Sequence, residues 1–140
     1  LRMQRHMQNT EAVVAFLAAH PMVERVGHLI LESHPSHAMA KKLLPRGAGS
    51  VFSFDIKGSR EQGQAFVEAL KVFSHLANVG DCRSLVIQPA STTHFRMDAA
   101  ALKQAGISPG TIRLSIGLED ADDLIDDLKR ALREAEKVGA

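Results

Sequence analysis

The sequence has no Trp, no Tyr, a single cysteine and no long apolar run. Phe is its one aromatic residue type, with six copies, which is a poor supply of stacking platforms for single-stranded nucleic acid. The lone Cys82 excludes an internal disulfide and suits a reducing compartment, so we expect a cytoplasmic protein. No segment approaches the roughly 20 apolar residues that a membrane-spanning helix requires. We therefore expect no nucleic-acid partner and no membrane partner.

The charge balance and the length leave a wide choice of functions. The net charge is +1, from 17 basic and 16 acidic side chains that are interspersed. Such a balance indicates neither a polyanionic partner nor an acidic tail. At 140 residues, the chain has the length of one ordinary domain. A helical pattern is already running at Leu1, which predicts that the chain is a piece of a longer polypeptide.

Apolar periodicity predicts helices and strands in alternation. The predicted helices cover residues 3–19, 37–44, 59–73, 97–105 and 121–137, and the predicted strands cover residues 23–26, 50–56, 84–87 and 111–117. Isolated strands separated by helices predict an α/β (α+β) fold, in which helices cover one sheet mainly on one side.

The two outer helices carry the clearest helical signals. The apolar stripe expected in the first helix is Met3, Met7, Thr10, Val14 and Leu17. The stripe expected in the last helix is Leu124, Ile125, Leu128, Ala131, Leu132 and Ala135. Ser36 and Asp120 are predicted N-caps, and Asp123 would complete a weak capping box with Asp120.

Arg113 is the most informative residue of the sequence. It lies in the strand 111–117, where it shares a face with Thr111 and Ser115, while Ile112 and its apolar neighbours share the other. A guanidinium on a half-buried strand needs an anionic partner, because an unpaired buried charge costs several kcal/mol. The partner is either a ligand carboxylate or phosphate held by the planar fork, or an internal acid, unless the side chain simply extends to the surface.

Other candidate sites are weaker. His34 and His37 are close in sequence but have no third spaced ligand, so we predict no metal site. The run 47–50 is glycine-rich but precedes a strand rather than a helix, so we interpret it as a turn. Cys82 lacks a recognisable base, which favours a small half-buried residue over a nucleophile. The loop 77–81 offers backbone N–H groups and the Asn78 amide to an anion, although by itself it is equally typical of a turn.

Taken together, these segments resemble the C-terminal domain of the Cys/Met-metabolism pyridoxal-phosphate enzymes. The motifs that carry the resemblance are Ser74–Asp81 (SHLANVGD), Ser84–His94 (SLVIQPASTTH) and Gly106–Asp120 (GISPGTIRLSIGLED), with Ala19–Val26 and His34–His37 upstream. The resemblance covers essentially the whole chain. Within the family, the Ala-Asn-Val-Gly-Asp form is most similar to the O-acetylhomoserine sulfhydrylases.

The resemblance implies a role for each of five residues. Arg113 matches the arginine that binds the α-carboxylate of the amino-acid substrate. Asn78 matches a position that lines the same carboxylate site, and Val79 and Gly80 shape that loop. Thr93 matches a threonine that supports the loop from behind. The implied fold is the small, largely antiparallel domain of fold-type I pyridoxal-phosphate enzymes.

The sequence departs from the family pattern at two positions. Gln88 stands where His is expected, and Cys82 stands where a small Ala is common, so both alter the packing of the loop. In addition, none of the lysines lies in the setting of the lysine that holds pyridoxal 5′-phosphate as a Schiff base. The resemblance thus implies that residues 1–140 are a single C-terminal domain, that the large cofactor-binding N-terminal domain is absent, and that this fragment is inactive and does not bind the cofactor covalently.

The implied parent enzyme converts O-acetyl-L-homoserine and sulfide to homocysteine and acetate in methionine biosynthesis. Its expected partners are these two substrates and the N-terminal domain, in a homotetramer. A methionine γ-lyase or a cystathionine γ-synthase is the alternative within the family. Outside the family, the alternative is a stand-alone, non-catalytic module that binds small acids or another protein.

Overall fold

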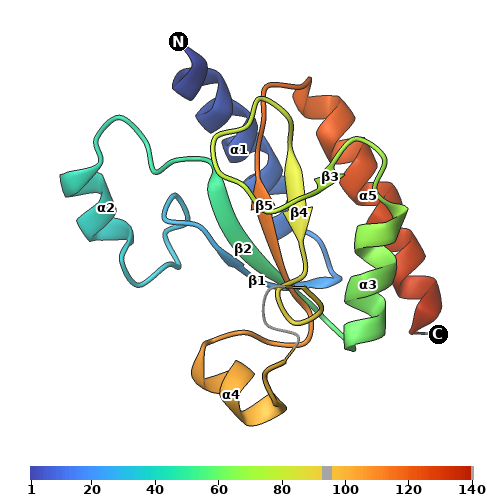
Figure 1. The fold of residues 1–140 in the computed structure, drawn as a ribbon. Helices are drawn as coiled ribbons and strands as arrows, with labels where there is room; N and C mark the ends of the chain where they lie inside the picture. Colours follow the sequence, from blue (N-terminus) through green and yellow to red (C-terminus); the bar gives the residue numbers. More distant parts are fainter. Residues whose placement is uncertain (93–95, 140) are drawn as a thin grey trace.

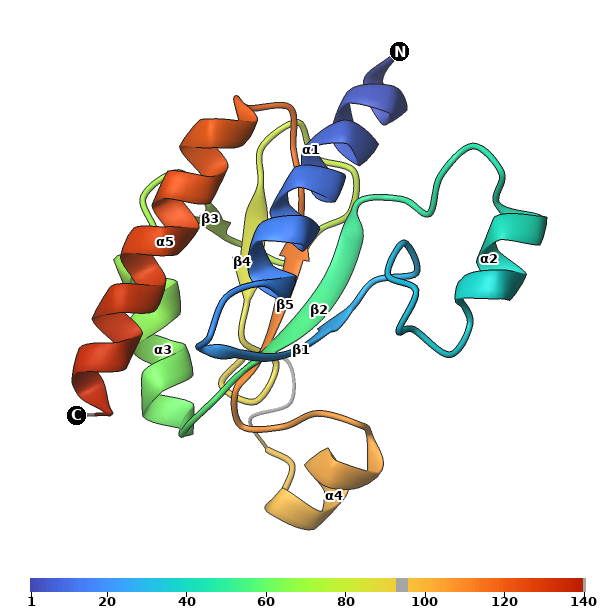
Figure 2. The same cartoon turned by 180° about the vertical axis from the view of Figure 1, so that it is seen from behind.

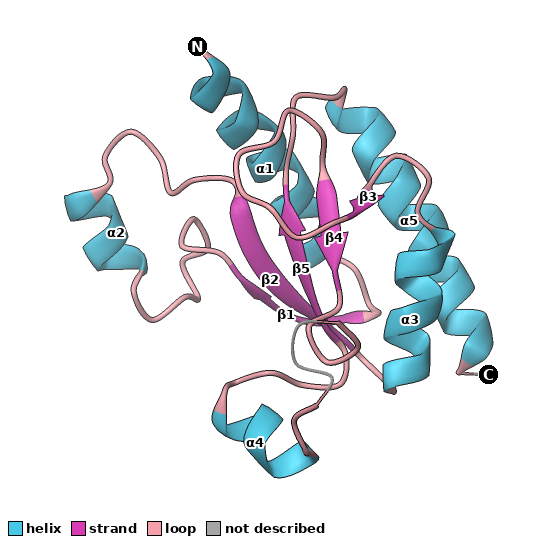
Figure 3. Cartoon of the chain, in the orientation of Figure 1, coloured by secondary structure: helices cyan, strands magenta, loops and turns pink. Residues whose placement is uncertain are grey.

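The computed structural model describes residues 1–92 and 96–139, which form one sheet with helices packed on it (Figure 1). The strands are β1 (Val23–Gly27), β2 (Val51–Ile56), β3 (Ser74–His75), β4 (Leu85–Ile87) and β5 (Thr111–Ser115). Their order in the sheet is β1-β2-β5-β4-β3, with β3 and β4 parallel and the other pairs antiparallel. Figure 3 shows β5 near the middle of this sheet, between β2 and β4.

The helices lie mainly on one side of the sheet. They are α1 (Arg2–Ala18), α2 (His37–Leu43), α3 (Arg60–Ala69), α4 (Ala99–Gln104) and α5 (Ala121–Val138). Figure 2 shows α1 crossing the sheet, α3 and α5 packed beside each other, and α2 and α4 standing away from the body. The predicted fold class, a largely antiparallel sheet covered by helices on one side, is confirmed.

The core lies between this helical layer and one face of the sheet. Alternation sends Ile112, Leu114 and Ile116 to that face, and all three are fully buried. They join one apolar cluster with Phe54 of β2 and Phe66 of α3, whose rings meet edge to face at 5.8 Å. Because the apolar side of β5 is consumed by the core, its polar side, with Arg113, faces away from α1.

The stripe predicted for the first helix is partly wrong. Met3 is half exposed, whereas His6 and Asn9 are buried. The reason is tertiary, since both polar side chains meet backbone carbonyls beyond β5. The Nδ1 of His6 lies 2.6 Å from the Ile116 oxygen, and the Asn9 amide donates to Gly117 at 3.1 Å. These bonds offset part of the cost of burial, although the Nε2 of His6 and the Oδ1 of Asn9 are buried without a partner among the described residues.

The predicted helix caps have mixed outcomes. Asp120 is the N-cap of α5, as predicted, but its carboxylate accepts from the Asp122 N–H at 2.9 Å rather than from Asp123. Ser36 occupies the N-cap position of α2 without a side-chain cap bond. Its own N–H donates instead to the His34 ring at 3.1 Å.

The third helix is shorter than predicted, ending at Ala69 rather than Phe73. The Asp127 carboxylate of α5 accepts from the N–H groups of Lys71 at 3.0 Å and Val72 at 2.8 Å, and from that of Phe73 at 3.3 Å. These three N–H groups donate to Asp127 of α5 and not to carbonyl groups of α3, so the helix does not continue through them. The short strand β3 follows directly, and sequence periodicity did not indicate it.

Candidate functional site

Arg113 lies at the centre of the polar face of the sheet. In the register of the strands, its Cα partner on β2 is Ser53 and its Cα partner on β4 is Ile87. The residue is half-buried, so its guanidinium is partly withdrawn from water while one side stays open. Antiparallel pairing fixes the backbone on both sides, and the position of the charge is therefore set by two neighbouring strands.

Within residues 1–92 and 96–139, no hydrogen bond or ion pair engages the Arg113 guanidinium. The acid on the same face of β2, Asp55, is already committed. Its carboxylate pairs with Arg25 at 3.0 Å and accepts from the Thr111 hydroxyl at 2.6 Å. The internal salt bridge that the sequence left open is thus taken by Arg25, and Arg113 keeps its capacity for an anion.

The acids that follow β5 are also engaged elsewhere. The Glu119 carboxylate accepts from the Ser84 N–H at 2.6 Å and from the Ser84 hydroxyl at 2.8 Å. Asp120 caps α5, and Asp122 and Asp123 lie exposed in its first turn. Among the described acids, those nearest to Arg113 in sequence therefore serve to join β4 to α5 and to start α5.

Hydroxyl groups flank the guanidinium on the same face. Ser53 lies directly across from Arg113, and Ser115 lies two residues along the strand on the same side. The Ser115 hydroxyl is buried and has no partner among the described residues. Among the described residues it shares this state with one atom each of His6 and Asn9, whereas most buried polar groups of proteins are satisfied. The face therefore combines a free cation with free hydroxyls, an arrangement that suits a carboxylate or phosphate.

The predicted loop around Asn78 lies on the same side of the sheet as Arg113. Figures 1 and 2 show the connection between β3 and β4 on the side opposite α1. Asn78 and Val79 are exposed, and the Asn78 side-chain oxygen accepts from the Val79 N–H at 2.8 Å. Gly80 adopts a φ of +78°, a left-handed conformation that favours glycine.

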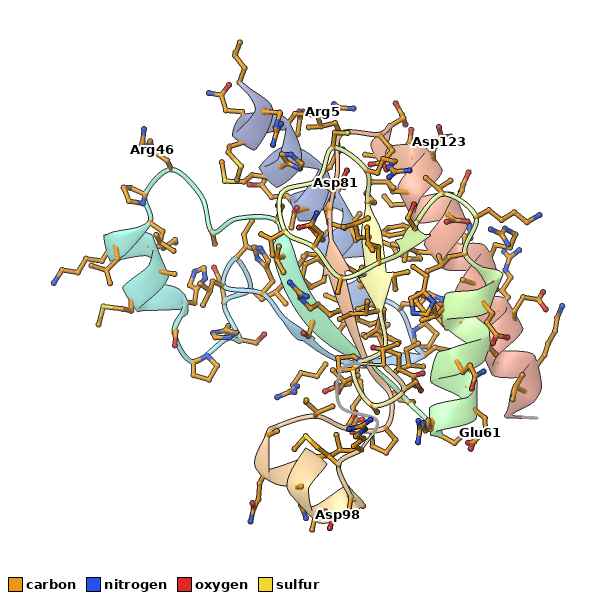
Figure 4. The ribbon with its side chains drawn as sticks, viewed as in Figure 1. Arg5, Arg46, Glu61, Asp81, Asp98 and Asp123 are labelled. Carbon is orange, nitrogen blue, oxygen red and sulfur yellow. The ribbon has the colours of Figure 1, made fainter. Side chains whose placement is uncertain are left out.

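Charged groups hold this loop in place. The Arg2 guanidinium of α1 donates to the Gly80 oxygen at 2.9 Å. The Asp81 carboxylate accepts from the Arg83 N–H at 2.9 Å, and this hydrogen bond lowers the pKa of Asp81. Figure 4 shows Asp81 toward the same end of the molecule as Arg5 and far from Asp98. Cys82 is exposed, not half-buried as the sequence suggested.

Two further residues singled out in the sequence, Gln88 and Thr93, follow β4. Thr93 lies outside the described residues, so its predicted support of the loop is not tested by the structure. Gln88, the departure from the family pattern, is almost fully buried and hydrogen bonds to three other segments. The structure thus adds Ser53 and Ser115 to the face that carries Arg113, and it places Gln88 one position after Ile87, the Cα partner of Arg113 on β4. Sequence alternation already placed Ser53 and Ser115 on polar faces, but did not tell which strands would be neighbours.

The lysines of the chain bear on whether it could hold pyridoxal phosphate. Every lysine of the chain is exposed (Lys41, Lys42, Lys57, Lys71, Lys103, Lys129 and Lys137). A lysine that carries a pyridoxal phosphate must lie in an enclosed site with groups that hold the ring and phosphate. The lysines of this chain do not fit that requirement. A cavity of about 300 Å³ between α1 and the α2 segment has only Lys41 at its margin, and none of the predicted site residues lines it.

Residues 1–92 and 96–139 meet neither the requirements of a metal site nor those of a membrane-spanning helix. Across the described part of the chain, no three His, Cys, Asp or Glu side chains cluster in a way that could hold a metal ion. In the same residues, no helix has both the length and the apolar character needed to cross a bilayer.

The chain matches known proteins over most of its length. The family model described as Cys/Met metabolism PLP-dependent enzyme matches residues 1–133. The chain is 47% identical to a Schizosaccharomyces pombe homocysteine synthase over 135 residues, which is 96% of this chain and 32% of the relative. It is 46% identical to a Corynebacterium glutamicum O-acetyl-L-homoserine sulfhydrylase, covering 92% of this chain and 30% of the relative.

Solved structures give the same result for the fold. A Campylobacter jejuni O-acetylhomoserine (thiol)-lyase structure with N′-pyridoxyl-lysine-5′-monophosphate matches with a TM-score of 0.87 and 42% identity, covering 94% of this chain and 31% of that one. A Xanthomonas oryzae cystathionine γ-synthase in complex with cystathionine matches with a TM-score of 0.89 and 40% identity, covering 97% and 35%. The chain thus spans about a third of the length of these proteins.

Proposed function

Because this chain belongs to the Cys/Met-metabolism family of pyridoxal-phosphate-dependent enzymes, we propose that it is the substrate-carboxylate-binding domain of an O-acetylhomoserine sulfhydrylase. The whole enzyme would convert O-acetyl-L-homoserine and sulfide to homocysteine and acetate. In this proposal, residues 1–140 form the C-terminal domain, and the large domain that carries the cofactor lysine lies outside this chain.

One observation carries the proposal: the Arg113 guanidinium is half-buried and has no partner among the described residues, on a face whose acid is already paired with another arginine. A carboxylate that arrives at this position can form two parallel hydrogen bonds with the planar fork. Asn78, Val79 and Gly80 would line the site from the loop above the same face. Thr93 is proposed to support that loop.

The domain would act by binding and orientation. Pyridoxal phosphate, when bound to the rest of the enzyme, supplies the electron sink for chemistry at the amino-acid carbons. Arg113 would hold the α-carboxylate of the substrate, so that the amino group and the reacting carbons keep one orientation. Fixing a substrate in this way lowers the barrier, because the entropy of alignment is lost on binding rather than in the reaction. With only exposed lysines, the chain by itself should neither bind the cofactor covalently nor turn over.

The carboxylate role can be tested with Arg113→Ala in the full-length enzyme that contains this chain. We expect the KM for the amino-acid substrate to rise about 100-fold, because a charge-assisted bidentate pair contributes about 2–4 kcal/mol. Arg113→Lys keeps the charge but loses the planar fork. Its KM should lie between that of the parent enzyme and that of Arg113→Ala. Arg133→Ala removes an exposed charge from α5, outside the proposed site, and serves as the control. An unchanged KM for Arg113→Ala would eliminate the proposed site.

The absence of covalent cofactor binding can be tested separately. Pyridoxal phosphate is added to residues 1–140, and the visible absorbance of a Schiff base is measured after removal of free cofactor. We expect no stoichiometric band. A band that survives dialysis, and that disappears in one lysine variant, would show that the chain holds the cofactor by itself.

The second candidate is a methionine γ-lyase or a cystathionine γ-synthase. It is favoured by the 42% identity to a Fusobacterium nucleatum L-methionine γ-lyase and by the cystathionine γ-synthase structure above. The full-length enzyme should be given O-acetyl-L-homoserine with sulfide or with cysteine, and L-methionine alone. Faster homocysteine formation with sulfide supports the sulfhydrylase. Preferential cystathionine formation, or release of methanethiol from methionine, would assign the enzyme to one of the other two.

A further inference from the structure

Gln88 ties three segments of the chain together at the end of β4. Its side chain is 2% exposed and follows Ile87, the Cα partner of Arg113 on β4. The Nε2 of Gln88 donates to the Arg60 oxygen and to the Pro109 oxygen, both at 3.0 Å. Its Oε1 accepts from the Ser91 hydroxyl at 2.6 Å. Both N–H groups and the oxygen of the amide are therefore used.

The backbone of Gln88 closes the turn that follows β4. Its carbonyl accepts from the Ser91 N–H at 3.0 Å and from the Thr92 N–H at 3.1 Å. The Thr92 hydroxyl donates to the same carbonyl at 2.9 Å. One residue thus holds its own turn, the start of α3 through Arg60, and the turn before β5 through Pro109. The last two links lie at the end of the sheet where β4 ends and β5 begins, two residues before Arg113 enters its pairing with Ile87.

The close approach of α3 to this amide depends on a glycine inside the helix. A Cβ placed on Gly63 would lie 2.4 Å from the Gln88 Nε2, which is closer than real Cβ contacts allow. Glycine in a helix interior costs about 1 kcal/mol relative to alanine. In α3, Gly63 therefore occupies the position where the Gln88 amide packs against the helix, in spite of its low helix propensity.

We propose that Gln88 is a positioning residue for the Arg113 anion site. Its amide holds the end of β4 against the turn that leads into β5, and this contact sets the place of the guanidinium between the two strands. The inference rests on the proposed function of Arg113 and adds a residue that does not itself touch the substrate. Small displacements matter at such a site, since a misplacement of about 1 Å can cost roughly 100-fold in rate.

The test uses Gln88→Glu in the full-length enzyme that contains this chain. The variant keeps the shape of the side chain but replaces the Nε2 amide group with a carboxylate oxygen. That oxygen would face the carbonyl oxygens of Arg60 and Pro109 and could not donate to them. We expect the KM for the amino-acid substrate to rise about tenfold, with kcat changed less than about twofold, since loss of ground-state binding raises KM. Gln8→Glu, an exposed position on α1, is the matched control and should leave KM unchanged.

A double-mutant cycle with Arg113→Ala separates positioning from general damage. If Gln88 acts through Arg113, Gln88→Glu should have no further effect on KM once Arg113 is removed. Additive effects on KM would overturn the inference while leaving the proposed function standing. No effect of Arg113→Ala alone would instead overturn the proposed function.

A second variant covers the case in which Gln88→Glu does not fold. Gly63→Ala should displace the Gln88 amide from the side of α3 without changing either strand. We expect a smaller rise in KM, about threefold, that likewise vanishes in the Arg113→Ala background. An unchanged KM in folded Gly63→Ala, or a rise that persists without Arg113, would contradict the inference.

Discussion

The Asp127 carboxylate joins α5 to the segment that follows α3, and its removal gives a sharp prediction. In the Asp127→Ala variant, the N–H groups of Lys71, Val72 and Phe73 lose their shared acceptor. The side chain of Asp127 is 2% exposed, so its carboxylate is shielded from solvent. Arg130, which pairs with Asp127 and also donates to the Ala69 oxygen at 2.5 Å, loses its anion.

The expected cost follows from which of these groups water can reach. Phe73 is buried, and leaving its N–H unsatisfied costs about 1–3 kcal/mol. Lys71 and Val72 are exposed, so water replaces much of what they lose. The Arg130 side chain is 38% exposed, which limits the ion-pair term to about 1 kcal/mol or less. Alanine improves helix propensity by about 0.5 kcal/mol, and the net loss is about 2–3 kcal/mol.

Hydrogen exchange of the segment that contains residues 71–73 measures this loss directly. Local protection should fall roughly 30- to 160-fold, the equivalent of about 2–3 kcal/mol. Asp126→Ala changes the exposed neighbouring acid on α5 and should leave the exchange unchanged. Equal protection in Asp127→Ala and Asp126→Ala would refute the argument that this carboxylate ends α3.

Three further predictions concern pH, packing and capping. Burial lowers the pKa of His28 from its ordinary value of 6.5, so its neutral form stabilises the fold above about pH 6.5, and this contribution is lost as pH falls toward the folded pKa. His28→Asn should therefore lose less urea resistance between about pH 7.5 and 5.5 than the parent chain. Gly110→Ala places a Cβ 2.2 Å from the Ile56 oxygen and should lower the free energy of unfolding by about 1–3 kcal/mol, measured with urea. Ser59→Ala removes a capping box shared with Gln62 and should cost about 1 kcal/mol, seen as faster exchange in the first turn of α3.

Each of these has a comparison that isolates its cause. His75→Asn changes an exposed histidine and should keep the pH dependence of the parent. Gly27→Ala meets the Ser53 oxygen at 3.2 Å and should cost less than Gly110→Ala. Thr10 lies inside α1, so Thr10→Ala should not change exchange in α3. The His28 prediction is wrong if His28→Asn and the parent chain show the same pH dependence of urea resistance. The packing prediction is wrong if Gly27→Ala and Gly110→Ala lower the free energy of unfolding equally. The capping prediction is wrong if Ser59→Ala leaves hydrogen exchange in α3 unchanged.

Much of the fold could be predicted from local pattern. The alternation in β2 and β5, the stripe of α5 and the Asp120 cap all depend on residues within one or two turns of each other. The errors arose where distant residues intervene. His6 and Asn9 are buried because carbonyls more than 100 positions away accept from them. The third helix stops early because an acid of α5 takes its next N–H groups.

The candidate site shows the same division. The position of Arg113 on a polar strand face and the motif of the Asn78 loop were visible in the sequence. The pairing of β5 with both β2 and β4 was not, because strand order depends on how the helices cover the sheet. The roles of Arg113, Asn78, Val79, Gly80 and Thr93 stay predictions that the enzyme assays above will decide.

The sequence by itself determined that Arg113 is a cation on a strand whose other face is fully apolar, since side-chain alternation is a local property of the backbone. Only the tertiary structure decided which acids of the chain were left to pair with Arg113. Asp55 lies on the same face but pairs with Arg25, which is 30 positions away and reaches it through the neighbouring strand β1. Glu119 turns to Ser84, 35 positions away. Such choices depend on which side chains the folded sheet brings within about 3 Å, a proximity that periodicity along one strand does not encode.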